Sequence, residues 1–79
     1  MNTLAVKSPV LMASEIWFDK DRLCVRLLDG REISVPLEWF HRLRDATDAQ
    51  RKKWRLIGRG IGIHWTDIDE DISVESLLK

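Results

Sequence analysis

The Asp29-Gly30 pair is the feature that most constrains the fold of this chain. Leu23, Val25 and Leu27 alternate with other side chains before the pair, and a second alternating run covers residues 31–35. An Asp-Gly pair between alternating runs is typical of a β-hairpin, because both central residues of a type I′ turn need a positive φ angle. The pair therefore predicts two antiparallel strands.

A further strand is expected over residues 13–18, where alternation precedes a turn cluster at residues 19–22. The three strands together predict an antiparallel meander. The first twelve residues lack periodicity and contain Ser8-Pro9, which is typical of a flexible arm. We therefore expect an arm over residues 1–12 and a single α+β domain over residues 13–79.

Helical spacing begins after Pro36, which ends the strand because it has no N–H to donate. Leu37, Phe40 and Leu43 then recur every three residues. This spacing predicts a helix of about ten residues with its apolar stripe on the sheet.

A second helix is predicted from Thr47, which forms a capping-box pattern with Gln50. Trp54 and Ile57 lie three residues apart and would face inward on this helix. Gly58 would end the helix.

The remaining chain predicts a fourth strand over residues 61–65 and a final short helix from Ser73. The expected fold is α+β, with a three- to four-stranded antiparallel sheet and two to three helices packed on one face. The 79 residues are 44% hydrophobic, which suffices for one core without metal. The single Cys24 excludes an internal disulfide.

Two stretches of this chain resemble a known family. Residues 54–78 hold two Trp, three Gly and five carboxylates, and residues 27–40 join a hairpin strand to a helix. Together they are similar to the small bacterial domain of unknown function numbered 2442, and the resemblance covers roughly residues 14–79. Proteins of that family are often encoded beside a second small protein, as in a toxin–antitoxin pair. The resemblance implies an antitoxin-like inhibitor.

Two motifs resemble ligand-binding loops only in part. The glycine-rich residues 58–63 have Ile63 where a dinucleotide fingerprint needs Gly. Residues 67–71 begin like a calcium loop, but Ile72 replaces the required Gly and Leu78 the bidentate Glu. We expect neither a phosphate site nor a calcium site.

No catalytic or metal motif is recognisable. Cys24, His41 and His64 have no spacing typical of zinc, and no nucleophile is paired with a base in the sequence. We therefore expect no cofactor, no metal and no enzymatic activity. The N-terminus lacks a secretory pattern, and no run approaches the roughly 20 apolar residues of a membrane helix, so we expect a cytoplasmic protein without membrane contact.

Charge is distributed unevenly although the net charge is zero. Residues 42–59 hold seven basic and two acidic side chains, and residues 66–79 hold five acidic and one basic. Such blocks are either solvated faces or patches that a complementary partner binds.

The preferred hypothesis is a non-enzymatic inhibitor that binds and blocks a protein, either as an antitoxin or as a phage-encoded anti-CRISPR protein. The target would be a toxin or a CRISPR effector subunit, and the acidic block would mimic DNA in a cationic groove. Strand alternation places Trp17 on the face opposite Ile16 and Phe18, where it is either an exposed interface anchor or packed under a neighbouring side chain. The predicted contacts are Asp67, Asp69, Glu70, Asp71, Glu75 and Trp17.

The alternative hypothesis is a nucleic-acid-binding regulator that uses a basic helix over residues 51–59. Its phosphate contacts would be Arg51, Lys52, Lys53, Arg55 and Arg59. Trp54 would lie in the core with Ile57 and would leave this patch without an aromatic platform for bases. The sequence allows a monomer or a homodimer paired through an edge strand.

Overall fold

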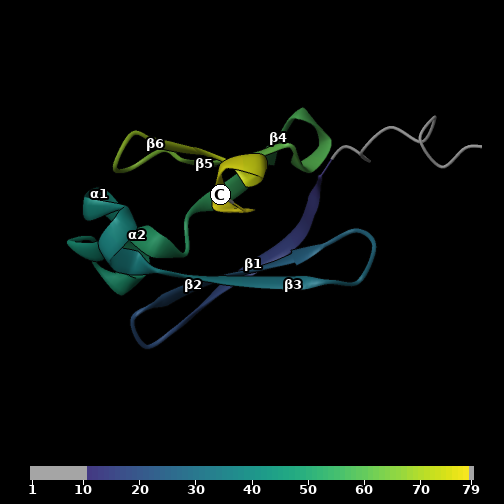
Figure 1. Cartoon of the computed structure of the whole chain (residues 1–79). Helices are drawn as coiled ribbons and strands as arrows, with labels where there is room; N and C mark the ends of the chain where they lie inside the picture. Colours follow the sequence, from purple (N-terminus) through teal and green to yellow (C-terminus); the bar gives the residue numbers. More distant parts are fainter. Residues whose placement is uncertain (1–10, 79) are drawn as a thin grey trace, which may run out of the picture.

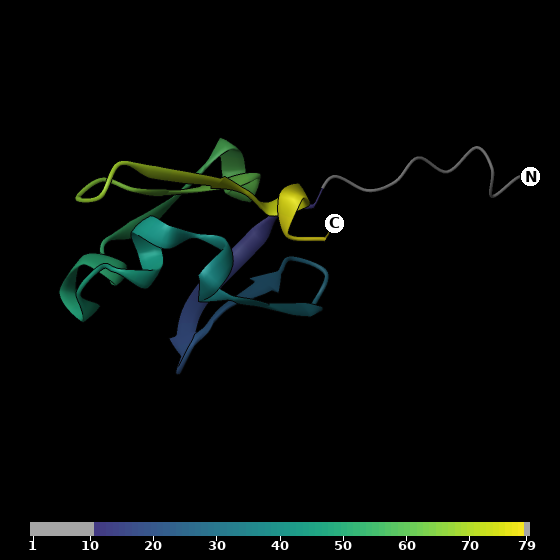
Figure 2. The same cartoon turned by 60° about the vertical axis from the view of Figure 1, so that its left-hand side comes forward.

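The computed structural model describes residues 11–78, and these residues form two antiparallel sheets (Figures 1 and 2). The first sheet has the order β1-β2-β3 and the second has the order β4-β5-β6. The strands are β1 (Ala13–Asp19), β2 (Arg22–Leu27), β3 (Glu32–Pro36), β4 (Trp54–Ile57), β5 (Gly62–Trp65) and β6 (Glu70–Ser73).

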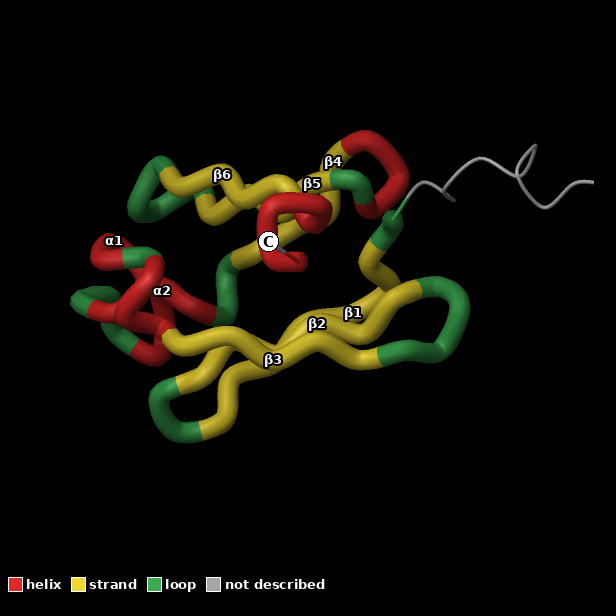
Figure 3. The backbone as a smooth tube through the Cα atoms, in the orientation of Figure 1, coloured by secondary structure: helices red, strands yellow, loops and turns green. Residues whose placement is uncertain are grey.

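The helices are short and lie around the sheets without forming a layer of their own. Figure 3 shows α1 and α2 at one end of the molecule, between the ends of the two sheets. The five helices of the described residues are η2 (Leu37–Trp39), α1 (His41–Arg44), α2 (Asp48–Arg51), η3 (Gly58–Gly60) and η4 (Val74–Leu78). None of the helices in the described part of the chain is long and apolar enough to cross a bilayer.

The hydrophobic core draws on the inner faces of both sheets. Trp65 of β5 is its largest fully buried side chain, and its indole N–H donates to the Arg51 carbonyl oxygen at 3.0 Å. The ring of Phe18 from β1 meets the Trp65 ring edge to face, with centroids 6.4 Å apart. Each sheet thus buries its apolar face against the other, as two-layer β folds require.

The prediction of an α+β fold with helices packed on one sheet is wrong, because the second half of the chain forms a second sheet. The predicted helix over residues 51–59 does not form, because α2 ends at Arg51 and residues 54–57 form β4. As a strand, this segment pairs Trp54 with Trp65 and Leu56 with Ile63. The apolar and polar side chains of residues 54–57 fit both the 3.6-residue period of a helix and the two-residue period of a strand. Pairing with β5 decides between the two.

The predicted helix after Pro36 is also wrong in its extent. Phe40 has φ −131° and ψ 89°, which separates η2 from the four-residue α1. Leu37 and Leu43 are nevertheless buried, as their spacing indicated. The final helix is the 3₁₀ helix η4, which begins after Ser73.

Several local predictions are confirmed. β2 and β3 form the predicted hairpin, and Thr47 and Gln50 make both hydrogen bonds of the capping box. The hairpin turn differs in type, since Gly30 has a positive φ (96°) and Asp29 does not. Instead, the Asp29 side chain accepts a hydrogen bond from the Arg31 backbone N–H at 3.0 Å. The predicted arm lies outside the described residues except for Leu11 and Met12.

Candidate partner-binding surface

The turn between β5 and β6 carries three of the predicted acidic residues. Asp67 and Asp69 are exposed there, and Glu70 begins β6. Lys53 lies 3.3 Å from the Asp67 carboxylate. We call residues 66–70 the acidic turn.

Arg42 of α1 also contacts the acidic turn. Its guanidinium donates to the Asp69 carbonyl oxygen at 2.6 Å and lies 3.9 Å from the Glu70 carboxylate. Asp69 has a positive φ of 52°, a conformation that Asp tolerates better than most residues. These contacts fix the turn before any partner binds.

The other two predicted acidic residues lie elsewhere. Asp71 is on the outer face of the second sheet, where its carboxylate bonds to the His64 ring. Glu75 is in η4, beyond the opposite end of β6. The structure therefore splits the predicted acidic cluster, because side chains on a strand alternate between its two faces and three strand residues separate Glu70 from η4.

Trp17 is half-buried, which lies between the exposed anchor and the packed side chain that strand alternation allowed. The guanidinium of Arg26 lies over its ring at 5.2 Å from the centroid. The indole also lines an open groove of about 420 Å³ beside β1. This groove, which we call the indole groove, is lined by Ile16, Trp17, Phe18, Asp48, Arg51, Lys52 and Trp54.

The indole groove and the acidic turn are joined by three consecutive residues. Lys52 and Trp54 line the groove, and Lys53 between them contacts Asp67. Trp17 and Asp67, which are far apart in the sequence, therefore belong to the same end of the molecule. Sequence reasoning missed the part that Trp54 plays, because a helix would have placed this indole in the core.

The predicted nucleic-acid-binding residues do not share one face. Lys52 follows α2, Arg55 is in β4 and Arg59 is in η3, where its φ is 63°. Lys53 is paired with Asp67. Because β4 replaces the predicted basic helix, the row of cations expected along it does not form.

Arg51 has a structural role in this region. Only 17% of its side chain is exposed, and its guanidinium donates to the carbonyl oxygens of Leu43 (2.8 Å) and Arg44 (2.7 Å). Its guanidinium also lies over the Phe18 ring, 5.7 Å from the centroid. Arg51 therefore satisfies the last carbonyls of α1 and forms one wall of the indole groove.

Replacing Arg51 by lysine is expected to lower the free energy of unfolding by about 1–2 kcal/mol, because an ammonium cannot reproduce the two-pronged contact with both carbonyls. Urea unfolding followed by tryptophan fluorescence measures this change. Arg55→Lys is the matched control, since Arg55 is exposed and should change stability little. Equal stability of the two variants would contradict the structural role of Arg51.

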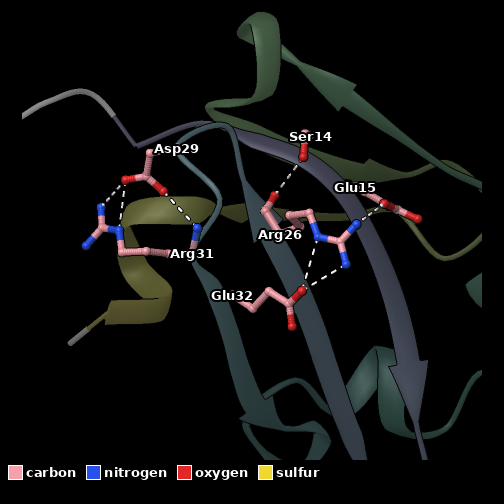
Figure 4. Close-up of polar contacts among 6 residues, drawn as sticks. All are labelled: Ser14, Glu15, Arg26, Asp29, Arg31 and Glu32. Atoms are coloured by element: carbon pink, nitrogen blue, oxygen red, sulfur yellow. Dashed lines mark hydrogen bonds and ion pairs between the residues drawn. The ribbon is translucent and has the colours of Figure 1, made fainter.

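The outer face of the first sheet is largely neutralised by its own side chains (Figure 4). Arg26 lies between Glu15 (3.1 Å) and Glu32 (2.8 Å), and Arg31 pairs with Asp29 at 2.8 Å. Hydrogen bonds from Arg31 hold the pKa of the Asp29 carboxyl below its usual value. Since these groups are exposed, the pairs stabilise the fold little.

The side chains whose chemistry would allow metal binding or nucleophilic attack do not cluster in the described part of the fold. Within residues 11–78, no group of three or more His, Cys, Asp or Glu side chains is placed to hold a metal ion. Cys24 is buried with its Sγ 3.7 Å from the Ser34 hydroxyl oxygen.

Comparison with known proteins identifies the family of this fold. Residues 13–79 match the model of the family described as "Protein of unknown function (DUF2442)". The chain belongs to the DUF2442 family. The resemblance found in the sequence is thereby confirmed.

A solved structure shares the DUF2442 fold of this chain. It is the crystal structure of a protein of unknown function from Rhodospirillum rubrum, which is 28% identical to this chain. The alignment covers 86% of this chain and 84% of that chain, with a TM-score of 0.74. No curated protein matches the chain. The function of this DUF2442 domain therefore has to be inferred from its own surfaces.

Proposed function

We propose that this DUF2442 domain is a non-enzymatic inhibitor that binds and blocks a cytoplasmic partner protein through the indole groove and the acidic turn. The observation that carries the proposal is the position of the groove directly beside the turn, with Lys53 between them. A groove that presents two indole rings next to the exposed carboxylates of Asp67 and Asp69 suits a protein partner with an apolar centre and a cationic rim.

The groove supports this proposal because tryptophan side chains contribute strongly to protein interfaces. Trp17 and Trp54 are both half-buried, so part of each ring is fixed while part remains accessible. Arg51 is held by two backbone carbonyls. A surface fixed in this way loses little conformational entropy when a partner binds.

The acidic turn supports an antitoxin-like inhibitor better than a DNA mimic. A DNA-like surface needs successive carboxylates without basic neighbours, whereas Lys53 and Arg42 stand beside Asp67 and Glu70. Asp71 and Glu75 extend the acidic surface in other directions. We therefore favour the antitoxin-like form over an anti-CRISPR protein that occupies a DNA groove.

Removing the Trp17 indole is expected to weaken partner binding by about tenfold or more, because truncation of a tryptophan that anchors an interface typically costs about 2 kcal/mol or more. The measurement is affinity capture from a bacterial lysate with and without nuclease, followed by titration of the captured protein. Trp39→Ala is the matched control, since Trp39 is 53% exposed and lies outside the groove. Capture that survives in Trp17→Ala, or that nuclease removes, would contradict the proposal.

A second pair of variants tests the acidic turn. Asp69→Asn removes a charge and tolerates the positive φ, and Asp19→Asn removes an exposed charge from the last residue of β1. We expect Asp69→Asn to slow association with the partner and Asp19→Asn to leave it unchanged, because charges at the rim of an interface mainly affect association rates.

A further inference from the structure

The outer face of the second sheet is open. Figures 1 and 2 show no described element above β5 and β6 on the side away from the first sheet. On the inner side, Ile63, Trp65 and Ile72 belong to the core. The outer face therefore carries the side chains that alternate with them.

One row of outer side chains is electrically asymmetric. Arg55 is in register with His64, and His64 is in register with Asp71. The cation thus stands on the edge strand β4 and the carboxylate on the opposite edge strand β6. The histidine between them bonds to Asp71 and lies on the central strand.

The next row combines one bulky apolar side chain with two small residues. Ile57 of β4 is in register with Gly62 of β5, and Gly62 with Ser73 of β6. Ile57 and Ile61 are 38% and 48% exposed. Both line an open, mainly apolar hollow of about 350 Å³, together with Gly62, Asp71 and Ser73.

We propose that this face binds a second copy of the chain, with a two-fold axis parallel to β5. Such an axis places β4 of one copy over β6 of the other. Arg55 then faces Asp71 of the second copy, and the bulky Ile57 faces the small Ser73 of the second copy. The face is complementary to itself in both charge and shape, as a two-fold interface requires.

The dimensions of the face predict a weak dimer. Three strands of four residues have a footprint on the order of 200 Å², from ~4.8 Å between strands and ~3.4 Å per residue. Stable interfaces bury about 800 Å² on each partner. The dimer should therefore form at high protein concentration, and it leaves the indole groove on the opposite side of the sheet free.

Exchanging the charges at positions 55 and 71 tests this arrangement. Self-association is measured by sedimentation velocity over a range of protein concentrations. Arg55→Asp and Asp71→Arg should each weaken self-association by about tenfold or more, because each places like charges opposite one another twice. An equimolar mixture of the two variants should associate at least as well as the original protein, since both facing pairs are then of opposite charge. Lys52→Asp is the control for a charge change outside the face and should have no effect.

Cross-linking provides a second readout of the dimer. The variant used for it loses the contact between His64 and Asp71 but keeps Arg55 and Asp71, which face each other across the proposed interface. Position 64 lies at the proposed axis, so a short bis-maleimide should link two copies of His64→Cys, whereas Lys20→Cys in the turn after β1 should give no linked dimer. A mixture that associates no better than its components, or a protein that sediments as a monomer at every concentration, would overturn the proposal. Equal cross-linking of the two cysteine variants would also overturn it.

Discussion

Replacing Trp65 by alanine is expected to cause one of the largest losses of stability that a single substitution can cause in this domain. Trp65 is fully buried at the centre of the core, and truncation of a buried tryptophan costs about 3–5 kcal/mol. A domain of this size has a total stability of about 4–12 kcal/mol. The variant also deprives the Arg51 carbonyl of its indole donor.

Circular dichroism and urea titration measure the effect of the Trp65 change. Trp65→Phe keeps an aromatic ring against Phe18 but loses the hydrogen bond, so we expect an intermediate loss of about 2 kcal/mol. Trp39→Ala removes an exposed tryptophan and should cost under about 1 kcal/mol. A Trp65→Ala protein that melts within a few degrees of the original would show that this ring does not organise the core.

The second large effect is expected from Gly60→Ala in η3. A Cβ at this position would lie 2.4 Å from the carbonyl oxygen of Ala13, and Gly60 has φ +105°. Ala13 begins β1, so the added methyl group would force apart the backbones that join the two sheets. We expect a loss of about 3 kcal/mol or more, from backbone strain together with the steric clash.

Gly30→Ala separates these two causes. Gly30 has a similar φ of +96°, but within residues 11–78 no residue other than its two chain neighbours comes within 4 Å of the position that a Cβ would take there. This variant should lose only the cost of the left-handed conformation, about 1–2 kcal/mol. If chemical denaturation gives the same stability for both variants, the close approach of Gly60 to Ala13 has no energetic consequence.

The local features of the first half of the fold were predictable from short sequence patterns. Asp29-Gly30 specified a hairpin because glycine relieves the strain of a positive φ, and Thr47 and Gln50 specified a helix start because their side chains satisfy free backbone groups. Both features depend on neighbours within a few residues. The structure confirms both predictions.

The candidate site was predictable only in part. The sequence pointed to Trp17 and to Asp67, Asp69 and Glu70, but it did not indicate that Lys53 and Arg42 would lie among the carboxylates. It also assigned Trp54 to a helix and therefore missed its place in the indole groove. Each of these contacts joins residues that are distant in the sequence.

By itself, the sequence determined the family, the first meander, the capped start of α2 and the separation of charge into blocks. Tertiary structure alone decided that residues 54–57 form a strand, because Trp54 and Leu56 gain more from pairing with β5 than a short helix gains from its own hydrogen bonds. It also divided the acidic block between the turn, the outer face and η4. Local propensity is nearly balanced in such segments, so the burial of the Trp65 and Ile63 side chains of β5 in the core between the two sheets determines the outcome.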